Sequence, residues 1–318
     1  MNSSLDIILV NWNAGQQLRQ CLDSIVSIKE DGFKIIRVVV VDNASTDGSV
    51  NGLDDSRLPL TIIRNKENFG FAKACNMGAS GSRAEYLLFL NPDTYLYETC
   101  LSTPIIFMES EDNKDVGIVG IRLVNEHGKF LPSCARYPTP GRFFSKMFGL
   151  DRLFPSFFPR HFMSEWDHKK SRVVDQVMGA FFLVRRQLFE MLCGFDERFF
   201  VYFEDVDFSL RAKQAGWISY YLAESKAYHR GQGSSDQVKA IRLFYSLHSR
   251  ILFGYKHFEG PSAIVLALGT ILIEPLNRFV LGAIHLSGRE IRETIEGYLL
   301  LWSEVPKLFR MRWQRFNR

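Results

Sequence analysis

The sequence lacks the cysteine pairs that mark a disulfide or zinc framework. It has five cysteines, which is an odd number, and none of them stands in a CxxC pair. Small domains held by disulfides or zinc carry closely spaced, usually even-numbered cysteines. We therefore expect free thiols and a reducing compartment.

A secretory signal is also missing from the start of the chain. No basic residue precedes the first apolar run, and that run ends at Asn11. A signal peptide combines a basic start with an apolar stretch of about 7–15 residues. We therefore expect a cytoplasmic protein.

The chain has no uninterrupted apolar run of membrane-spanning length. Residues 260–273 contain no charge, but Glu274, Pro275 and Arg278 follow before the apolar residues resume. A spanning helix needs about 20 apolar residues, and charges near its centre are costly. We therefore do not expect this segment to form a clean transmembrane helix.

A broadly basic surface is absent as well. The formal net charge is +4, from 39 basic and 35 acidic residues. Residues 307–318 and 133–172 each contribute +5, so the rest of the chain is acidic at −6. A general nucleic-acid binder carries positive charge across one face, so this class is excluded.

What the sequence does contain is an alternation of strand-like and helix-like segments. Short apolar, β-branched runs predict strands, and an apolar recurrence at helical spacing follows the first of them. A helix-like segment at 70–79 separates two later strands. This order predicts a doubly wound α/β sheet, with strands at 5–10, 35–41, 60–63 and 86–90.

Asparagine and aspartate follow four successive predicted strands. The carboxyl ends of parallel strands share one edge, where ligands of open α/β sheets bind. These residue types are also common in ordinary turns. Four such ends in a row favour a ligand site made of Asn11, Asn13, Asp42, Asn43, Asn65, Asn68, Asn91 and Asp93.

Residues 133–172 form an insert that is rich in aromatic residues and proline. The segment holds nine aromatic side chains, and its prolines predict loops and short helices. Two interpretations stay open. The insert is either a small satellite core or a binding surface for an amphipathic partner.

Three carboxylates lie within four residues at Glu204, Asp205 and Asp207. Clustered acids among aromatic residues raise one another's pKa, which suits a general base. On a helix, Glu204 and Asp207 share one face, and Arg211 lies one turn after Asp207, where it can neutralise it. The acids at an ordinary helix start do not explain this motif as well as a catalytic carboxylate does. We therefore expect one of the three to be catalytic.

In combination these motifs resemble the bacterial glycosyltransferases of family 2, which have the GT-A fold. The similarity covers about residues 5–235 and is strongest to the branch that contains rhamnosyltransferases for cell-surface polysaccharides. Seven motifs occur in the family's order: residues 8–13, 42–49, 68–72 with Asn76, 91–93, 179–186, 199–211 and 229–234.

The resemblance implies a role for each matching residue. Asp205 corresponds to the catalytic base, and Asp93 to the last carboxylate of the DxD metal motif, whose first position is Asn91 here. His229 would complete a site for Mg²⁺ or Mn²⁺ and the diphosphate. Asp42 would contact the nucleoside. The remaining matches are donor-pocket residues (Asn11, Asn13, Asn43, Asn68, Asn76, Asn91) and acceptor or supporting residues (Gly179, Ala180, Glu204, Asp207, Arg211).

The implied reaction is inverting transfer of a sugar, with rhamnose from dTDP-rhamnose preferred, to a lipid-linked or polysaccharide hydroxyl. A UDP-hexose or UDP-acetylhexosamine donor is the nearest alternative. Sugar nucleotidyltransferases typically have a glycine-rich phosphate loop with Lys or Arg near the N-terminus, which residues 11–19 lack. A non-catalytic carbohydrate-binding relative would be expected to lose Asp205 or Asp93, and both are present.

These expectations define two domains, a GT-A catalytic domain at 1–240 and a helical region at 241–318. Apolar and basic residues alternate along 291–316, which is typical of an interfacial helix. We expect a peripheral protein on the inner face of the cell membrane, held through 260–318 and also by 133–172 if that insert is a binding surface. Packing of this helix on the catalytic domain or in a homodimer is the alternative.

Overall fold

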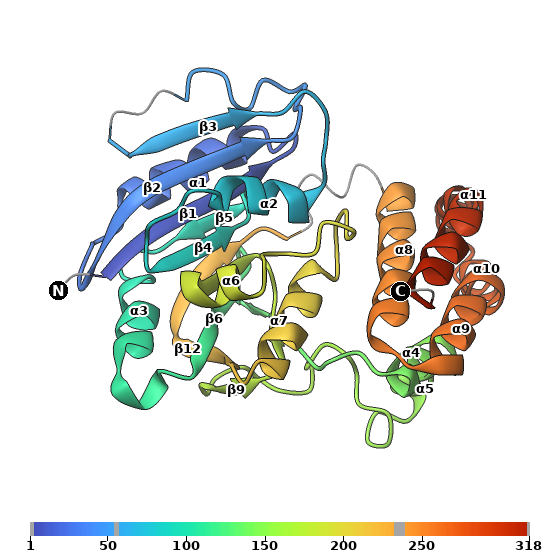
Figure 1. The fold of residues 1–318 in the computed structure, drawn as a ribbon. Helices are drawn as coiled ribbons and strands as arrows, with labels where there is room; N and C mark the ends of the chain where they lie inside the picture. The colour runs from blue at the N-terminus through green and yellow to red at the C-terminus, as the bar shows by residue number, and fades with distance from the viewer. Residues whose placement is uncertain (1–2, 54–56, 232–238, 317–318) are drawn as a thin grey trace. The chain divides into compact units, whose positions relative to one another are not determined.

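The structure is a computed structural model and describes residues 3–53, 57–231 and 239–316. The chain divides into two compact units, which we describe separately (Figure 1). Unit 1 comprises residues 1–137, 162–197 and 204–234, and unit 2 comprises residues 138–161, 198–203 and 235–318. Unit 2 therefore collects two short internal segments together with the C-terminal helices.

Unit 1 is built on one large, mixed sheet. Four parallel strands form one half of it, and β11 runs antiparallel between β4 and β6. The strand order is β3 (Leu60–Arg64), β2 (Phe33–Asp42), β1 (Ser3–Asn11), β4 (Tyr86–Leu90), β11 (Phe181–Arg185), β6 (Val116–Val124), β12 (Ile218–His229) and β5 (Thr94–Leu96). The predicted α/β class and the four N-terminal strands are confirmed.

Short strands and six helical segments complete unit 1. At the margins, β7 (Phe130–Leu131) pairs with β6 and β9 (Arg172–Val174) with β12, while β8 (Cys134–Ala135) and β10 (Gln176–Val177) form a separate pair. The helices are α1 (Gln16–Val26), α2 (Phe71–Ala79), α3 (Ser102–Glu109), η1 (Glu111–Asn113), α6 (Arg186–Met191) and α7 (Glu204–Gln214).

Successive residues of the central strands point to two hydrophobic cores, one on each face of the sheet. In β1, Leu5, Ile7 and Leu9 join the core that contains residues of α1 and α3. Ile8 and Val10 join the second core, with residues of α2, α6 and α7. This period-two alternation, apolar on both faces, explains why these strands appear in the sequence as continuous apolar runs.

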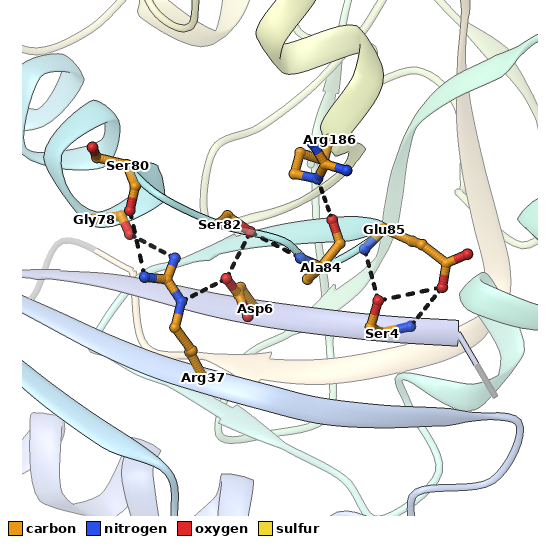
Figure 2. A network of polar contacts seen from close by, with 9 residues as sticks. All are labelled: Ser4, Asp6, Arg37, Gly78, Ser80, Ser82, Ala84, Glu85 and Arg186. Atoms are coloured by element: carbon orange, nitrogen blue, oxygen red, sulfur yellow. Dashed lines mark hydrogen bonds and ion pairs between the residues drawn. The ribbon is translucent and has the colours of Figure 1, made fainter.

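An ion pair between Asp6 of β1 and Arg37 of β2 fastens the end of α2 to the sheet (Figure 2). Asp6 is fully buried, and its Oδ2 accepts hydrogen bonds from Arg37 Nε at 2.8 Å and from Ser82 Oγ at 2.7 Å. Arg37 also donates to the carbonyls of Gly78 and Ser80 at the end of α2. A buried carboxylate needs such partners, and here they connect three elements.

Unit 2 is helical. It contains α4 (Pro140–Met147), α5 (Leu150–Leu153), α8 (Lys239–His257), α9 (Gly260–Leu268), a π-helical segment η3 (Gly269–Ile273), α10 (Glu274–Ile284) and α11 (Gly288–Phe316). Tyr298 and Leu301 of α11 are fully buried, so one side of this helix packs within the protein. Pro306 lies inside α11 without ending it.

The charged residues that divide the apolar segment in the sequence do not end the helix there, and the expectation that it is not a clean transmembrane helix stays a prediction. Residues Gly260–Ile284 form one unbroken run of helix, which by length and composition alone would be able to cross a membrane. Pro275 stands at the start of α10, where proline is tolerated. Glu274 is buried and forms ion pairs with both Arg250 and Arg278. The two charged residues of this segment, Glu274 and Arg278, therefore pair with each other, and the helix continues through them.

Helix α2 lies so close to the sheet that a methyl group would not fit at Gly78. A Cβ there would lie 2.5 Å from Ile8 Cγ2 and 3.1 Å from Val41 Cγ2. Overpacking of this kind costs about 1–3 kcal/mol, so Gly78→Ala should lower the free energy of unfolding by that amount in denaturant titrations. Gly141→Ala is the matched control, because this helical glycine has open space around it. Equal stability of both variants would show that α2 moves freely away from the sheet.

Candidate active site

The polar residues expected at the strand ends do meet at one edge of the sheet. Asn11 and Asp42 are paired residues at the ends of β1 and β2, and Leu9 pairs with Leu90 at the end of β4. β12 ends at the same edge, because its His229 pairs with Thr94 just after Asp93. The edge therefore carries carboxylates, amides and an imidazole.

Asn11 organises the Asp42 end of this edge. Its side-chain nitrogen lies 2.8 Å from Asp42 Oδ1, 2.9 Å from Ser45 Oγ and 2.8 Å from Ser49 Oγ. Asn11 is fully buried, and Asp42 is 4% exposed. Asn11 thus holds the Asp42 carboxylate and the following turn in place. Asn13 supports the same turn, since its Oδ1 accepts from the backbone N–H of Thr46 at 2.8 Å.

Three further predicted asparagines hold the neighbouring loops. Asn43 donates from Nδ2 to the Gly70 carbonyl at 3.0 Å, and Asn65 donates to Asn43 Oδ1 at 2.9 Å. Asn68 Oδ1 accepts from the Gly70 N–H at 2.9 Å, just before α2 begins. These bonds fix the loops that follow β2 and β3 beside the Asp42 carboxylate.

Asn76 is engaged elsewhere. Its amide makes a reciprocal pair of 2.9 Å hydrogen bonds with the backbone N–H and carbonyl of Phe195, and it also donates to Glu197 Oε1 at 3.1 Å. A Cβ on Gly194 would lie 2.6 Å from Asn76 Oδ1, so this loop requires glycine. In this structure Asn76 ties α2 to the loop before the acidic motif, and its place in a donor pocket stays a prediction.

Asp93 and His229 lie together. His229 Nε2 is 3.2 Å from Asp93 Oδ1, and both side chains are 11% exposed. This approach lacks hydrogen-bond geometry, and the buried His229 Nε2 has no hydrogen-bond partner among the described residues. Within that part of the chain no group of three or more His, Cys, Asp or Glu side chains forms a metal site. A carboxylate and an imidazole suit a cation that takes its remaining ligands from phosphate.

Asp205 is held at this edge by backbone amides. Its Oδ2 accepts from Gly179 N–H at 2.9 Å and its Oδ1 from Val206 N–H at 2.8 Å, and the buried Gln176 side chain adds a third hydrogen bond. Burial raises the pKa of Asp205 above its ordinary value, although these hydrogen bonds oppose the shift. Ala180, which follows Gly179 in the chain, accepts a hydrogen bond from the Asn91 N–H at 3.1 Å. Through Gly179 and Ala180, Asp205 is therefore connected to the end of β4.

The other members of the acidic motif play different parts. Asp207 is fully buried and pairs with Arg211, whose Nε lies 2.8 Å from its Oδ2. Arg211 also donates to the carbonyls of Leu192 and Gly194, so this pair fastens α7 to a neighbouring loop. Burial, together with the charges of Asp205 and Asp207, raises the pKa of Glu204 well above its ordinary value.

Some features of the site lie outside the sequence prediction. Gln176 carries no local signal, because its contact with Asp205 joins residues far apart in the chain. Tyr202 and Phe203, which immediately precede α7, both have positive φ angles, 68° and 69°. Two consecutive non-glycine residues in this region are rare, and both belong to unit 2. Nothing in the sequence distinguishes these two aromatics from the others nearby.

The mixed sheet, with its polar residues gathered at one edge, has the GT-A fold of the glycosyltransferases. Residues 6–192 match the family model described as glycosyl transferase family 2. The match covers more than half of the chain, and the protein belongs to this family.

Named relatives include rhamnosyltransferases. The chain is 25% identical over 269 residues to the N-acetylglucosaminyl-diphospho-decaprenol L-rhamnosyltransferase of Mycobacterium tuberculosis H37Rv, covering 80% of this chain and 84% of the relative. It is 32% identical over 148 residues to the rhamnosyltransferase WbbL of Escherichia coli K12, covering 46% and 52% of the two chains.

Solved structures agree on the fold. The mannosyltransferase PcManGT of Pyrobaculum calidifontis, in complex with GDP-Man and Mn²⁺, superposes with a TM-score of 0.55 over 97% of this chain and 88% of its own, at 16% identity. TarS 1–349 of S. aureus with UDP gives 0.52 over 96% and 92%, at 13% identity.

The raised pKa of Glu204 predicts how its substitution changes stability. Between the pKa of Glu in the unfolded chain and the higher folded value, the folded state binds the extra proton, so its stability falls as pH rises. Glutamine at position 204 does not ionise. Glu204→Gln therefore removes this pH-dependent loss of folding stability and the repulsion between the Glu204 carboxylate and those of Asp205 and Asp207. Denaturant titrations should show the variant more stable than the parent by about 1 kcal/mol or more above the folded pKa. The difference should vanish at acidic pH, and a pH-independent difference would contradict the assignment.

Proposed function

We propose that this glycosyltransferase transfers rhamnose from dTDP-rhamnose to a hydroxyl of a lipid-linked acceptor, with inversion at the anomeric carbon. The observation that carries the catalytic part is Asp205, a carboxylate of raised pKa fixed by two backbone N–H groups beside the end of β4. The donor and acceptor follow from relatives whose names specify rhamnosyl transfer, one of them to a diphospho-decaprenol.

The chemistry is a single displacement. The acceptor oxygen attacks the anomeric carbon while the bond from that carbon to the diphosphate oxygen breaks. The proton of the acceptor hydroxyl passes to the Asp205 carboxylate, whose raised pKa favours accepting it. No enzyme nucleophile is required, and the departing nucleoside diphosphate carries away the bonding electrons.

Asp93 and His229 are the residues that would hold a divalent cation. Their 3.2 Å separation, and the buried imidazole nitrogen without a hydrogen-bond partner among the described residues, fit a shared cation. Mg²⁺ or Mn²⁺ there would offset the charge of the leaving diphosphate. Asp42, held by Asn11 and the Ser45 turn, would receive the nucleoside at the other end of the edge.

The proposed acceptor places the enzyme at the cytoplasmic face of the membrane, where a lipid-linked substrate would be met. A UDP-hexose donor is the second candidate, because a 30% identical segment of 110 residues is shared with the UDP-Glc-dependent glucosyltransferase WfaP of Escherichia coli. Binding of dTDP-linked and UDP-linked sugars distinguishes the two candidate donors.

Asp205→Asn should keep donor binding and lose transfer by about a hundredfold or more, because the amide cannot accept the hydroxyl proton. Binding is measured by calorimetry with dTDP-rhamnose, UDP-glucose and UDP-acetylglucosamine, and transfer with a lipid-linked acceptor. Asp23→Asn is the control, since the Asp23 side chain lies in an exposed ion pair with Arg57. Transfer by Asp205→Asn at the parent rate would refute the base assignment. Failure of every nucleotide sugar to bind the parent would refute the function.

Asp93→Asn should weaken donor binding in Mg²⁺ or Mn²⁺ while leaving the metal-free affinity unchanged. The expected loss is at least the roughly tenfold that removal of an outer-shell partner costs a metal site. The measurement is donor titration with and without EDTA, compared for the parent and the variant. An equal loss in EDTA would mean that Asp93 contacts the donor directly or supports the fold.

A further inference from the structure

The outer side of the helix from Gly260 to Ile284 presents an unbroken row of exposed apolar side chains. We call it the apolar face. The exposed fractions of its six members range from 42% to 68%. They recur every three or four residues along α9, η3 and α10: Val265, Leu268, Leu272, Leu276, Val280 and Ile284.

An exposed row of apolar side chains is the opposite of what a surface helix in water normally shows. A helix that covers a water-soluble domain carries polar residues on its outer side, and large contiguous apolar patches mark interaction sites. The only charged residues within Gly260–Ile284 are Glu274 and Arg278. Glu274 is buried between Arg250 and Arg278, so both charges are used within unit 2 and neither interrupts the apolar face.

Unit 2, to which the apolar face belongs, carries an excess of positive charge. Unit 2 contains 17 basic and 8 acidic residues, a formal net charge of +9, whereas unit 1 is left with −5. Arg152, Lys239 and Arg278 line a cavity of about 310 Å³ that also includes Leu281, next to Val280 of the apolar face. Two carboxylates, Glu290 and Glu293, share this cavity, and Arg278 also pairs with Glu274.

Charge decides which partner fits. A second copy placed face to face would bring two units of +9 together, and like charges oppose such contact. An anionic lipid surface complements the same charge, and each basic residue near it contributes about 1 kcal/mol. We propose that the apolar face docks unit 2 on an anionic lipid bilayer, with Gly260–Ile284 lying in the interfacial layer.

The helix lies in the surface rather than crossing it. About 39% of its most apolar stretch is buried within the protein, and α11 packs against α10. α11 exposes charged residues, including Arg289 and Arg292, which a crossing would carry into hydrocarbon. Trp302 of α11 is 43% exposed and donates from Nε1 to the Ile271 carbonyl at 3.1 Å. A half-exposed tryptophan fixed beside the apolar face suits the headgroup level.

Vesicle flotation of the full chain, without donor or acceptor, tests this docking independently of catalysis. The probes are phosphatidylcholine vesicles with and without about 30% phosphatidylglycerol. The parent should bind the anionic vesicles, and Leu272→Glu/Leu276→Glu should reduce its partition coefficient by about tenfold or more. Ile106→Glu, at a similarly exposed apolar position in α3 of unit 1, should bind as the parent does. Circular dichroism and donor binding verify the fold of each variant.

Brominated lipids provide a second readout. They should quench a component of the parent's tryptophan fluorescence that Trp302→Phe removes. The proposal is overturned if the parent ignores anionic vesicles or if the double variant binds them unchanged. It is also overturned if light scattering without lipid shows a dimer that the double variant converts to monomers, because the apolar face would then belong to a second copy.

Discussion

The pairing of β11 with β4 is the constraint on which the site depends. Leu90 and Phe181 are opposite each other in this antiparallel pair, although 90 residues of chain separate them. The pairing sets Ala180 against the Asn91 N–H and leaves Gly179 free to donate to Asp205. The turn that carries Asp93 and the helix that carries Asp205 are thereby fixed to one strand end.

Within the acidic motif, burial and pairing give neighbouring carboxylates different chemistry. Asp207 has a guanidinium partner at 2.8 Å and serves to fasten α7. Asp205 has only backbone amides and an amide side chain, which orient the carboxylate without neutralising it. Glu204 is buried and flanked by both acids, which raises its pKa well above its ordinary value. One turn of helix thus separates a structural ion pair from the carboxylate that we propose as the proton acceptor.

The sequence revealed the parts of the fold that depend on local pattern. Residues 35–41 predict a buried strand because all of them except Arg37 are valine or isoleucine. The polar residues that follow each strand mark the ligand edge. It did not reveal what distant residues contribute. The Asn76–Phe195 clamp and the Gln176–Asp205 contact join segments far apart in the chain. Neither produces a periodicity or a motif, so neither is visible before the chain folds.

The same distinction explains the apolar helix. In the sequence, Glu274 and Arg278 interrupt a hydrophobic run, because the sequence does not show which residues neutralise their charges. In the folded unit, Arg250 of α8 reaches Glu274 and turns an isolated charge into a buried, neutralised cluster on the inner side of the helix. The six exposed side chains of the apolar face then form an uninterrupted row, and unit 2 as a whole carries a strong positive charge. A net charge of +4 for the whole chain conceals this arrangement, in which an acidic catalytic unit is joined to a strongly basic helical one. Apolar burial, which is short-ranged, would set the depth of a docked helix, and the charge, which acts over about a Debye length, would set how readily it arrives.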